Sequence, residues 1–306
     1  MIGFDPLNEP YVGNTLRRPD LLMPGAFDRK RLQPMYAKVF EKYYANDQDT
    51  IMYFEPGTFP NVISYFGGYI TYSGFTEPPG AQIGSRNHVF NDHTYCCQLD
   101  ASVCALGEPS TDLASECYAW HEKRIGKRSQ DAERLGVPFF LSEFGACLTE
   151  EPCTQEIRQV TEVSDRYLAS WAYWEFKKFE DLTTSAGTGS EGFYNNDGSL
   201  QSWKVKALAR TYLMYTQGVP TLNMFDMDSG VFLGEWTVDT EISKPTVVYF
   251  SSEYYYANGV KYDVSIDGVR LGEDQYTVNQ TDLYVELLVT DPALNGKTIA
   301  LVLQGN

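Results

Sequence analysis

The chain has 306 residues, of which 43% are hydrophobic and 14% aromatic, enough for a large core and for two domains. Its 41 Asp and Glu outnumber its 24 Lys and Arg, and no stretch gathers basic residues, so nucleic acid is not expected as a partner. No apolar run approaches the roughly 20 residues that cross a bilayer. We therefore expect no membrane-spanning helix, while peripheral contact with membrane lipid stays open.

Short apolar runs alternate with stretches of helical periodicity over the first two thirds of the chain. The expected elements are a strand end at 2–9, a helix at about 28–45, strands at 51–56 and 87–95, a helix near 114–135, a strand at 137–143, a helix at about 154–166 and a strand at 168–176. A last helix carries Val205, Leu208, Ala209, Tyr212 and Tyr215 on one face and ends at Gly218 and Pro220. This alternation predicts a parallel sheet covered by helices. The connection at 57–86 is long and rich in aromatic residues, which is uncommon unless a loop serves binding.

After Pro220 the pattern changes to short alternating strands separated by turns. The run Tyr262–Ile266 is followed by Asp267-Gly268, a pair typical of a hairpin turn, and alternation returns at 283–289 and 298–303. We therefore expect an α/β domain over residues 1–219 and a small antiparallel β-sandwich over residues 220–306.

The six cysteines all fall within one third of the chain, at Cys96, Cys97, Cys104, Cys117, Cys147 and Cys153. Their even number and loop-like surroundings indicate disulfides, with Cys147 and Cys153 closing a short loop and Cys96 and Cys97 reaching Cys104 and Cys117. Zinc is the alternative, but there is no C-x-x-C pair and there are only three histidines. The cysteines indicate an oxidising, extracellular type of compartment, whereas no secretion signal follows Met1, which taken literally predicts a chain that is not exported.

Two glutamates stand where predicted strands end. Glu9 lies in the stretch Gly3–Pro10, and Glu143 closes the apolar run Val137–Ser142. Active sites of parallel α/β folds are built at the carboxyl ends of the strands. Alone, Glu143 would be a solvated strand-end carboxylate, but its apolar flank provides a setting that shifts a pKa. Two such carboxyls, one protonated and one ionised, are what retaining glycoside hydrolysis requires.

Four segments together resemble glycoside hydrolase family 5, in order and at roughly the family's spacing: Asn8-Glu9-Pro10, His93-Thr94-Tyr95, Ser142-Glu143-Phe144-Gly145 and Trp174 on a later strand. Within that family, the stretches Gly3–Pro10, Tyr53–Pro56 and Ser170–Lys177 and the appended sandwich look most like the endoglycoceramidases. Those enzymes release an intact glycan from a glycosphingolipid by cutting its β-glucosyl link to ceramide. The resemblance covers nearly the whole chain.

The resemblance implies a role for each motif residue. It makes Glu9 the acid/base, Glu143 the nucleophile, Tyr95 the hydrogen-bond partner of that nucleophile, His93 and Asn8 sugar contacts, and Trp174 the platform under the sugar at the cleavage point. Taken singly, His93 fits a satisfied core histidine equally well, and Trp174 fits simple core. The mechanism needs no metal or organic cofactor.

A full (β/α)8 TIM barrel has eight strands in about 250 residues, whereas we expect five before the sandwich, and the Asn-Glu-Pro motif normally closes the fourth. The expected fold is therefore an incomplete barrel, about strands 4 to 8, and the resemblance implies an N-terminally truncated chain whose full-length form is extracellular or lysosomal. The expected substrate is a glycosphingolipid or another β-glycan, and a monomer is favoured. Two alternatives are a family 5 endo-β-glucanase or mannanase acting on polysaccharide, and an inactive remnant.

Overall fold

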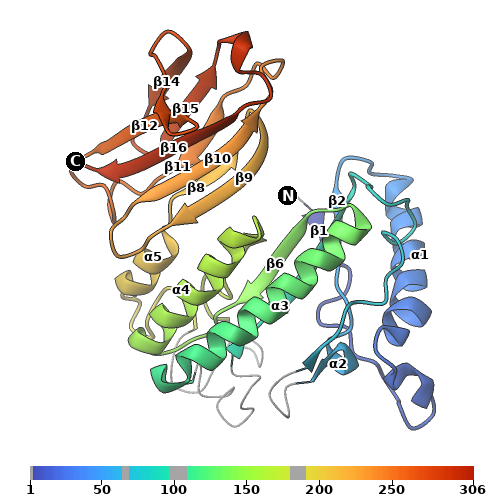
Figure 1. The fold of residues 1–306 in the computed structure, drawn as a ribbon. Helices are drawn as coiled ribbons and strands as arrows, with labels where there is room; N and C mark the ends of the chain where they lie inside the picture. The colour runs from blue at the N-terminus through green and yellow to red at the C-terminus, as the bar shows by residue number, and fades with distance from the viewer. Residues whose placement is uncertain (1–2, 64–68, 97–108, 180–190) are drawn as a thin grey trace. The chain divides into compact units, whose positions relative to one another are not determined.

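The computed structural model describes residues 3–63, 69–96, 109–179 and 191–306 (Figure 1). The chain divides into two compact units, Met1–Leu200 and Gln201–Asn306, and each is described by itself. The division falls before the expected boundary at residue 219, because the segment expected as the last helix of the first domain belongs to the second unit. Within the described residues, no helix is both long and apolar enough to cross a membrane.

The first unit is built on a parallel five-stranded sheet. In sheet order the strands are β1 (Gly3–Phe4), β2 (Ile51–Phe54), β5 (His88–Thr94), β6 (Phe139–Phe144) and β7 (Ser170–Trp171). The predicted parallel sheet is confirmed, although β7 is shorter than the expected strand at 168–176. Every residue of the central strand β5 is buried, as in a parallel strand covered on both faces. The carboxyl ends of all five strands consequently meet at one edge.

Three long helices accompany this sheet. They are α1 (Gln33–Tyr44), which continues the π-helical turn η2 (Asp28–Leu32), α3 (Ala114–Leu135) and α4 (Glu150–Arg166). Helix α3 lies along β5 and β6, and α4 packs on α3 and β7 (Figure 1). Helix α3 ends at Gly136, whose φ of +64° is the left-handed conformation that glycine adopts without strain. The helices expected at 28–45, 114–135 and 154–166 are confirmed.

The long connection after β2 has structure of its own. It contains the short helix α2 (Thr58–Asn61) and two short antiparallel strands, β3 (Val62–Ile63) and β4 (Tyr69–Ile70), while residues 64–68 lie outside the described residues. The buried Asp28 carboxylate organises it, because Oδ1 accepts the Gly57 N–H at 2.9 Å and Oδ2 accepts the Gly74 N–H at 2.7 Å. The aromatic connection is therefore anchored to the start of the first long helix.

The second unit consists of a short helix and two antiparallel sheets. Helix α5 (Ser202–Leu208) precedes sheets of order β13-β12-β16-β10-β9 and β14-β15-β11-β8. The strands are β8 (Tyr212–Tyr215), β9 (Gly218–Phe225), β10 (Phe232–Val238), β11 (Thr246–Tyr249), β12 (Val260–Ile266), β13 (Val269–Arg270), β14 (Tyr276–Gln280), β15 (Tyr284–Val289) and β16 (Thr298–Gly305). The expected antiparallel strands and the turn at Asp267-Gly268 are present.

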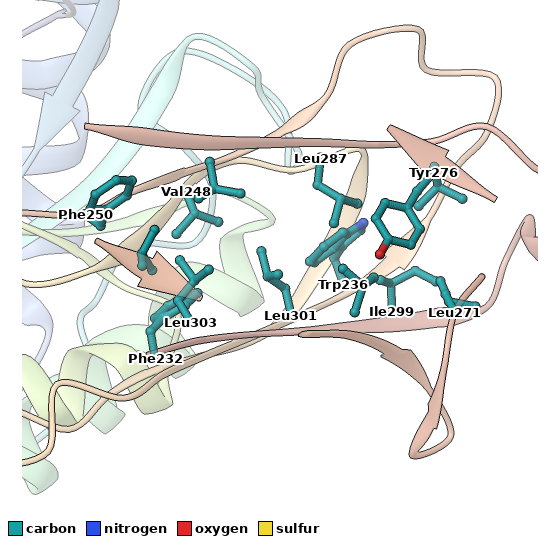
Figure 2. Packing of buried hydrophobic residues seen from close by; sticks show 14 of the residues in the cluster. Phe232, Trp236, Val248, Phe250, Leu271, Tyr276, Leu287, Ile299, Leu301 and Leu303 are labelled. Carbon is teal, nitrogen blue, oxygen red and sulfur yellow. The ribbon is translucent and has the colours of Figure 1, made fainter. Parts of the chain in front are cut away.

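The two antiparallel sheets share one hydrophobic core (Figure 2). Trp236 on β10 and Leu301 on β16 face Val248 on β11 and Leu287 on β15, and all four side chains are fully buried. Burying a large apolar side chain contributes about 1.5–3 kcal/mol, so this core holds the sheets face to face as a sandwich.

The expected last helix, which carries Val205 and ends at Gly218, is wrong in its second half. Helix α5 ends at Leu208, and Tyr212–Tyr215 is strand β8, which pairs antiparallel with β11. The apolar positions recur at helical spacing, but Tyr-Leu-Met-Tyr suits an edge strand equally well. Pairing with residues 246–249 supplies hydrogen bonds that local periodicity cannot reveal, so the all-β part begins before Pro220.

Among the described residues, two disulfides join elements of the first unit. Cys96 pairs with Cys117 and Cys147 with Cys153, with Cα–Cα distances of 5.1 and 5.3 Å. The predicted Cys147–Cys153 bridge is confirmed, and so is the connection from Cys96 to Cys117. Cys97 and Cys104 lie outside the described residues.

Candidate active site

A register shift between β5 and β6 sets the centre of the site. Asp92 pairs with Leu141, but the next residue, His93, pairs with Glu143, so Ser142 is skipped. Such a bulge re-aims side chains at the end of a strand. It places the predicted His93 directly beside the predicted Glu143 at the carboxyl edge of the sheet.

His93 connects the two predicted catalytic glutamates. Its Nδ1 lies 2.9 Å from Glu9 Oε1 and 3.4 Å from Glu143 Oε2, and its ring is 2% exposed. One carboxylate oxygen of each glutamate and a nitrogen of His93 all lie within 4.8 Å of one another. Retaining glycosidases hold their two carboxyls about 5–5.5 Å apart and inverting ones about 6.5–9.5 Å apart. The spacing therefore fits retention.

Tyr95 orients the Glu143 carboxylate from the end of β5. Its hydroxyl donates a hydrogen bond of 2.8 Å to Glu143 Oε2, the contact that the family resemblance implies. Burial raises the pKa of Glu143, while the charge of His93 and the Tyr95 hydrogen bond oppose that rise. The Glu143 side chain is 16% exposed, so it is largely desolvated and still accessible. A fixed, poorly solvated carboxylate of this kind is suited to nucleophilic attack.

Glu9 occupies an unusual backbone conformation just after β1. Its φ of +44° is left-handed, a conformation that costs a non-glycine residue about 1–3 kcal/mol and needs support from its surroundings. Its backbone N–H donates to Glu55 Oε2 at 2.8 Å, and its side chain is 48% exposed. The hydrogen bond from His93 lowers the pKa of Glu9. Glu9 thus reaches solvent while its backbone is held.

The raised pKa of His93 favours a proton on its ring. Burial disfavours the charged ring, but the hydrogen bond to Glu9 and the charges of Glu55 and Glu143 outweigh burial and raise the pKa of His93 to about 9. A general acid needs that proton on Glu9. The state with protonated Glu9 and neutral His93 holds the same number of protons and is reached along the 2.9 Å hydrogen bond. Together the pair keeps one transferable proton up to about pH 9.

The remaining two predicted residues lie at the strand ends. Asn8 is exposed beside Glu9. Trp174 is half-buried after β7, where its backbone N–H donates to the Phe144 carbonyl at 2.9 Å. Among the described residues, no hydrogen bond or ring contact connects the Asn8 amide or the Trp174 indole to the centre of the site, which consists of Glu9, His93, Tyr95 and Glu143. Their roles as sugar contacts stay predictions.

Four polar residues that support the site are absent from the predicted set. The Asn91 amide donates to Asp5 Oδ2 at 2.9 Å and to Ser142 Oγ at 3.0 Å, which ties together the ends of β1, β5 and β6. Glu55 comes directly after β2, Glu9 comes five residues after the end of β1, and a proline follows each glutamate. This repeated strand-Glu-Pro pattern was the signal that could have identified Glu55.

Metal coordination by the same groups is disfavoured by their protonation. Glu9, His93 and Glu143 form a possible ligand set, but His93 Nδ1 is engaged by Glu9, and its ring stays protonated until about pH 9. A metal requires a neutral, free imidazole nitrogen. A second set includes Cys96, whose sulfur is in a disulfide. The geometry favours acid–base and nucleophilic chemistry.

Curated relatives share both parts of the chain. Endoglycoceramidases from Cyanea nozakii and Hydra vulgaris are 24% identical over 268 residues and 26% identical over 266 residues. Each alignment covers 87% of this chain but 47% and 45% of the respective relative. The chain therefore spans a little under half of the length of these relatives.

Solved structures show the same fold. Endo-glycoceramidase II from Rhodococcus sp., in a ganglioside GM3 complex, matches all of this chain and 59% of its own, with a TM-score of 0.69 and 19% identity. Cryptococcus neoformans sterylglucosidase 1 matches 90% of this chain and 44% of its own, with a TM-score of 0.61 and 12% identity.

Family models account for most of the sequence. The model described as cellulase (glycosyl hydrolase family 5) matches residues 1–180, and the model of the glycoside hydrolase family 5 C-terminal domain matches residues 210–302. The first match alone covers more than half of the chain and contains all the residues of the site. The protein belongs to glycoside hydrolase family 5.

Proposed function

We propose that this protein is a retaining β-glycosidase that separates the glycan of a glycosphingolipid from its ceramide. The observation that carries the proposal is the placement of Glu9 and Glu143 on either side of His93, at a spacing that suits retention. The names of the relatives support the substrate class. One solved neighbour is a lactosyl-enzyme intermediate, the covalent species that a glutamate nucleophile forms.

The reaction runs in two steps. In the first, a Glu143 carboxylate oxygen attacks the anomeric carbon, the bond to the ceramide oxygen breaks, and that oxygen takes the proton held by Glu9 and His93. In the second, Glu9 accepts a proton from water as the water oxygen attacks the anomeric carbon and Glu143 leaves as a carboxylate. One water is consumed, and ceramide and a free glycan result. Tyr95 holds Glu143 in the attacking orientation.

The parallel sheet corresponds to about strands 4 to 8 of a (β/α)8 barrel, with the catalytic domain in the unit Met1–Leu200 and the sandwich in the unit Gln201–Asn306 rather than divided at residues 219 and 220. The order of strands in the sheet follows the chain, as in a barrel wall, and the structural neighbours support this correspondence. In such a barrel, Asn8 contacts the sugar beside Glu9, and Trp174 forms the platform at the cleavage point.

A lipid aglycone agrees with the surface that follows Glu9. Tyr11, Leu16 and Met23 are 71%, 95% and 66% exposed. Single exposed apolar residues are ordinary, but three within residues 11–23, the stretch of chain that follows Glu9, provide apolar side chains for contact with lipid chains or with a membrane. The sterylglucosidase neighbour is also named for a sugar on a lipid.

A family 5 polysaccharide hydrolase is the second candidate, because the matching family model is named for cellulase. The discriminating experiment incubates the protein with lactosylceramide, with a ganglioside and with carboxymethyl cellulose, and measures released oligosaccharide. Glycolipid cleavage that Glu143→Gln abolishes, and that the exposed control Glu133→Gln retains, supports the proposal. Cleavage of cellulose alone selects the polysaccharide hydrolase, and no product from any substrate contradicts both.

We propose that this protein is located outside the cell or in the lysosome. The two disulfides support an oxidising compartment, since such bonds are rare in the cytosol. Thiol alkylation of the native protein, followed by mass measurement, tests this placement. Alkylation of Cys117 or Cys153 without prior reduction contradicts it.

A further inference from the structure

Glu55 is a buried glutamate with one satisfied and one unsatisfied oxygen. It follows β2, and its side chain is fully buried. Its Oε2 accepts the Glu9 N–H at 2.8 Å, whereas Oε1 has no hydrogen-bond partner among the described residues and lies 3.9 Å from His93 Nδ1. Burying a carboxylate is costly unless it is paired, so this placement needs a reason.

Glu55 belongs to a pair of attachments that hold the segment bearing Glu9. The Tyr36 hydroxyl donates to the Leu7 carbonyl at 3.3 Å and accepts the Glu55 N–H at 3.4 Å. Residue 9 is thus bound directly to Glu55 at the end of β2, and residue 7 is bound to the same place through the Tyr36 hydroxyl. The left-handed φ of Glu9 is a conformation that such fastening maintains against its intrinsic cost.

Three charged residues act on Glu55. His93 faces Glu55 from β5, and the charges of Asp5 and Asp92 also act on the Glu55 carboxyl. Burial raises the pKa of Glu55 to about 8, and the positive charge of His93 opposes that rise. Glu55 in turn favours the protonated form of His93. Both of its oxygens therefore act on the pair that holds the transferable proton.

Resting on the proposed glycosidase function, we propose that Glu55 is the positioning residue of the acid/base: one oxygen fixes Glu9 through its backbone N–H, and the other stands against His93. Glu55 does not touch the reacting atoms. Losing it releases Glu9 and weakens proton delivery to the leaving oxygen, but leaves Glu143 on β6 and its Tyr95 hydrogen bond in place. The expected defect is therefore confined to steps that need the acid/base.

The test compares substrates that do and do not need an acid. Lactosylceramide has a poor leaving group, whereas 2,4-dinitrophenyl β-lactoside departs without a proton. Glu55→Leu removes acceptor and charge, and we expect kcat/KM to fall about 10²–10³-fold on lactosylceramide and less than about 10-fold on the activated lactoside, within the range that acid catalysis supplies. Azide, which replaces base-activated water, restores kcat on the activated substrate and yields lactosyl azide. The exposed Glu77→Gln is the matched control.

Glu55→Gln keeps an acceptor for the Glu9 N–H but removes the negative charge beside His93. We expect the alkaline limb of its kcat/KM profile to move to lower pH, because the neutral amide at position 55 cannot favour protonated His93 as the Glu55 carboxylate does. If Glu55 had only a structural role, its substitution would lower kcat/KM equally for both substrates and would leave the alkaline limb at the same pH. Should Glu55→Leu fail to fold by circular dichroism, the limb of Glu55→Gln decides alone.

The outcomes separate the two proposals. Wild-type protein that cleaves neither substrate overturns the glycosidase and, with it, the role of Glu55. Active wild type combined with equal losses on both lactosides, or with an unmoved alkaline limb in Glu55→Gln, overturns the role of Glu55 alone. Selective loss on lactosylceramide, azide rescue and the shifted limb support it.

Discussion

Replacing Glu9 by glutamine tests the electrostatics of the site without any substrate. The substitution exchanges the carboxylate that lies 2.9 Å from His93 Nδ1 for a neutral amide of nearly the same shape. His93 is 2% exposed, and its pKa of about 9 depends on that carboxylate together with Glu55 and Glu143. Removing one of three negative neighbours lowers the pKa of His93.

The size of the effect follows from distance and exposure. An opposite charge within about 4–6 Å changes a pKa by about 1–3 units. Because Glu9 is 48% exposed, solvent screens it, and the loss of its charge lowers the His93 pKa by about 1–2 units, toward the lower part of that range. The two remaining carboxylates keep the ring from returning fully to its ordinary value.

The measurement is a histidine-selective NMR titration. The chain has three histidines, and burial lowers the pKa of His88 to about 4 and of His121 to about 3. A ring titrating in the alkaline range is therefore His93, and its ¹⁵N shifts report the midpoint in wild type and in Glu9→Gln. The exposed Glu133→Gln leaves that midpoint in place. An equal midpoint in wild type and Glu9→Gln refutes the ion-pair reasoning.

Three further predictions concern orientation and stability. Tyr95→Phe removes the 2.8 Å hydrogen bond to Glu143, so kcat falls about 10–100-fold and the acidic limb of the rate profile moves to higher pH, measured with an activated lactoside. Asp92→Asn leaves two buried arginines without their shared carboxylate and lowers the free energy of unfolding by about 3–5 kcal/mol in urea titration. The stability that His93 contributes is complete below its ordinary pKa of 6.5 and is lost as pH rises through about 9. The urea concentration at the unfolding midpoint therefore falls over that pH window in wild type, and it falls less in His93→Gln.

The candidate active site could be predicted from the sequence because parallel sheets bring strand ends together. Glu9 and Glu143 stand far apart in the chain, yet both stand where strands are expected to end, and a sheet with helical crossovers aligns its carboxyl ends at one edge. The family motif then added His93 and Tyr95. What the sequence could not show is the register shift that skips Ser142, since a bulge depends on the pairing of two distant strands.

The failures share a physical cause. Tyr212–Tyr215 carries apolar residues at helical spacing, but its partner strand lies more than thirty residues away, so pairing overrode the local pattern. Glu55 escaped notice because a strand-end glutamate is ordinarily solvated, and only the fold reveals that it is fully buried under Glu9. Long-range pairing and burial are properties of the assembled sheet.

Trapping of the nucleophile tests the central claim most directly. The protein is incubated with 2-deoxy-2-fluoro-β-lactosyl fluoride. Its 2-fluorine slows both steps, whereas its anomeric fluoride leaves readily and keeps the first step fast, so a glycosyl ester accumulates. Peptide mass mapping of a retaining enzyme built on this site finds one fluorolactosyl group on Glu143, and none in Glu143→Gln. An adduct on another residue, or no adduct in protein that cleaves lactosylceramide, contradicts Glu143 as the nucleophile.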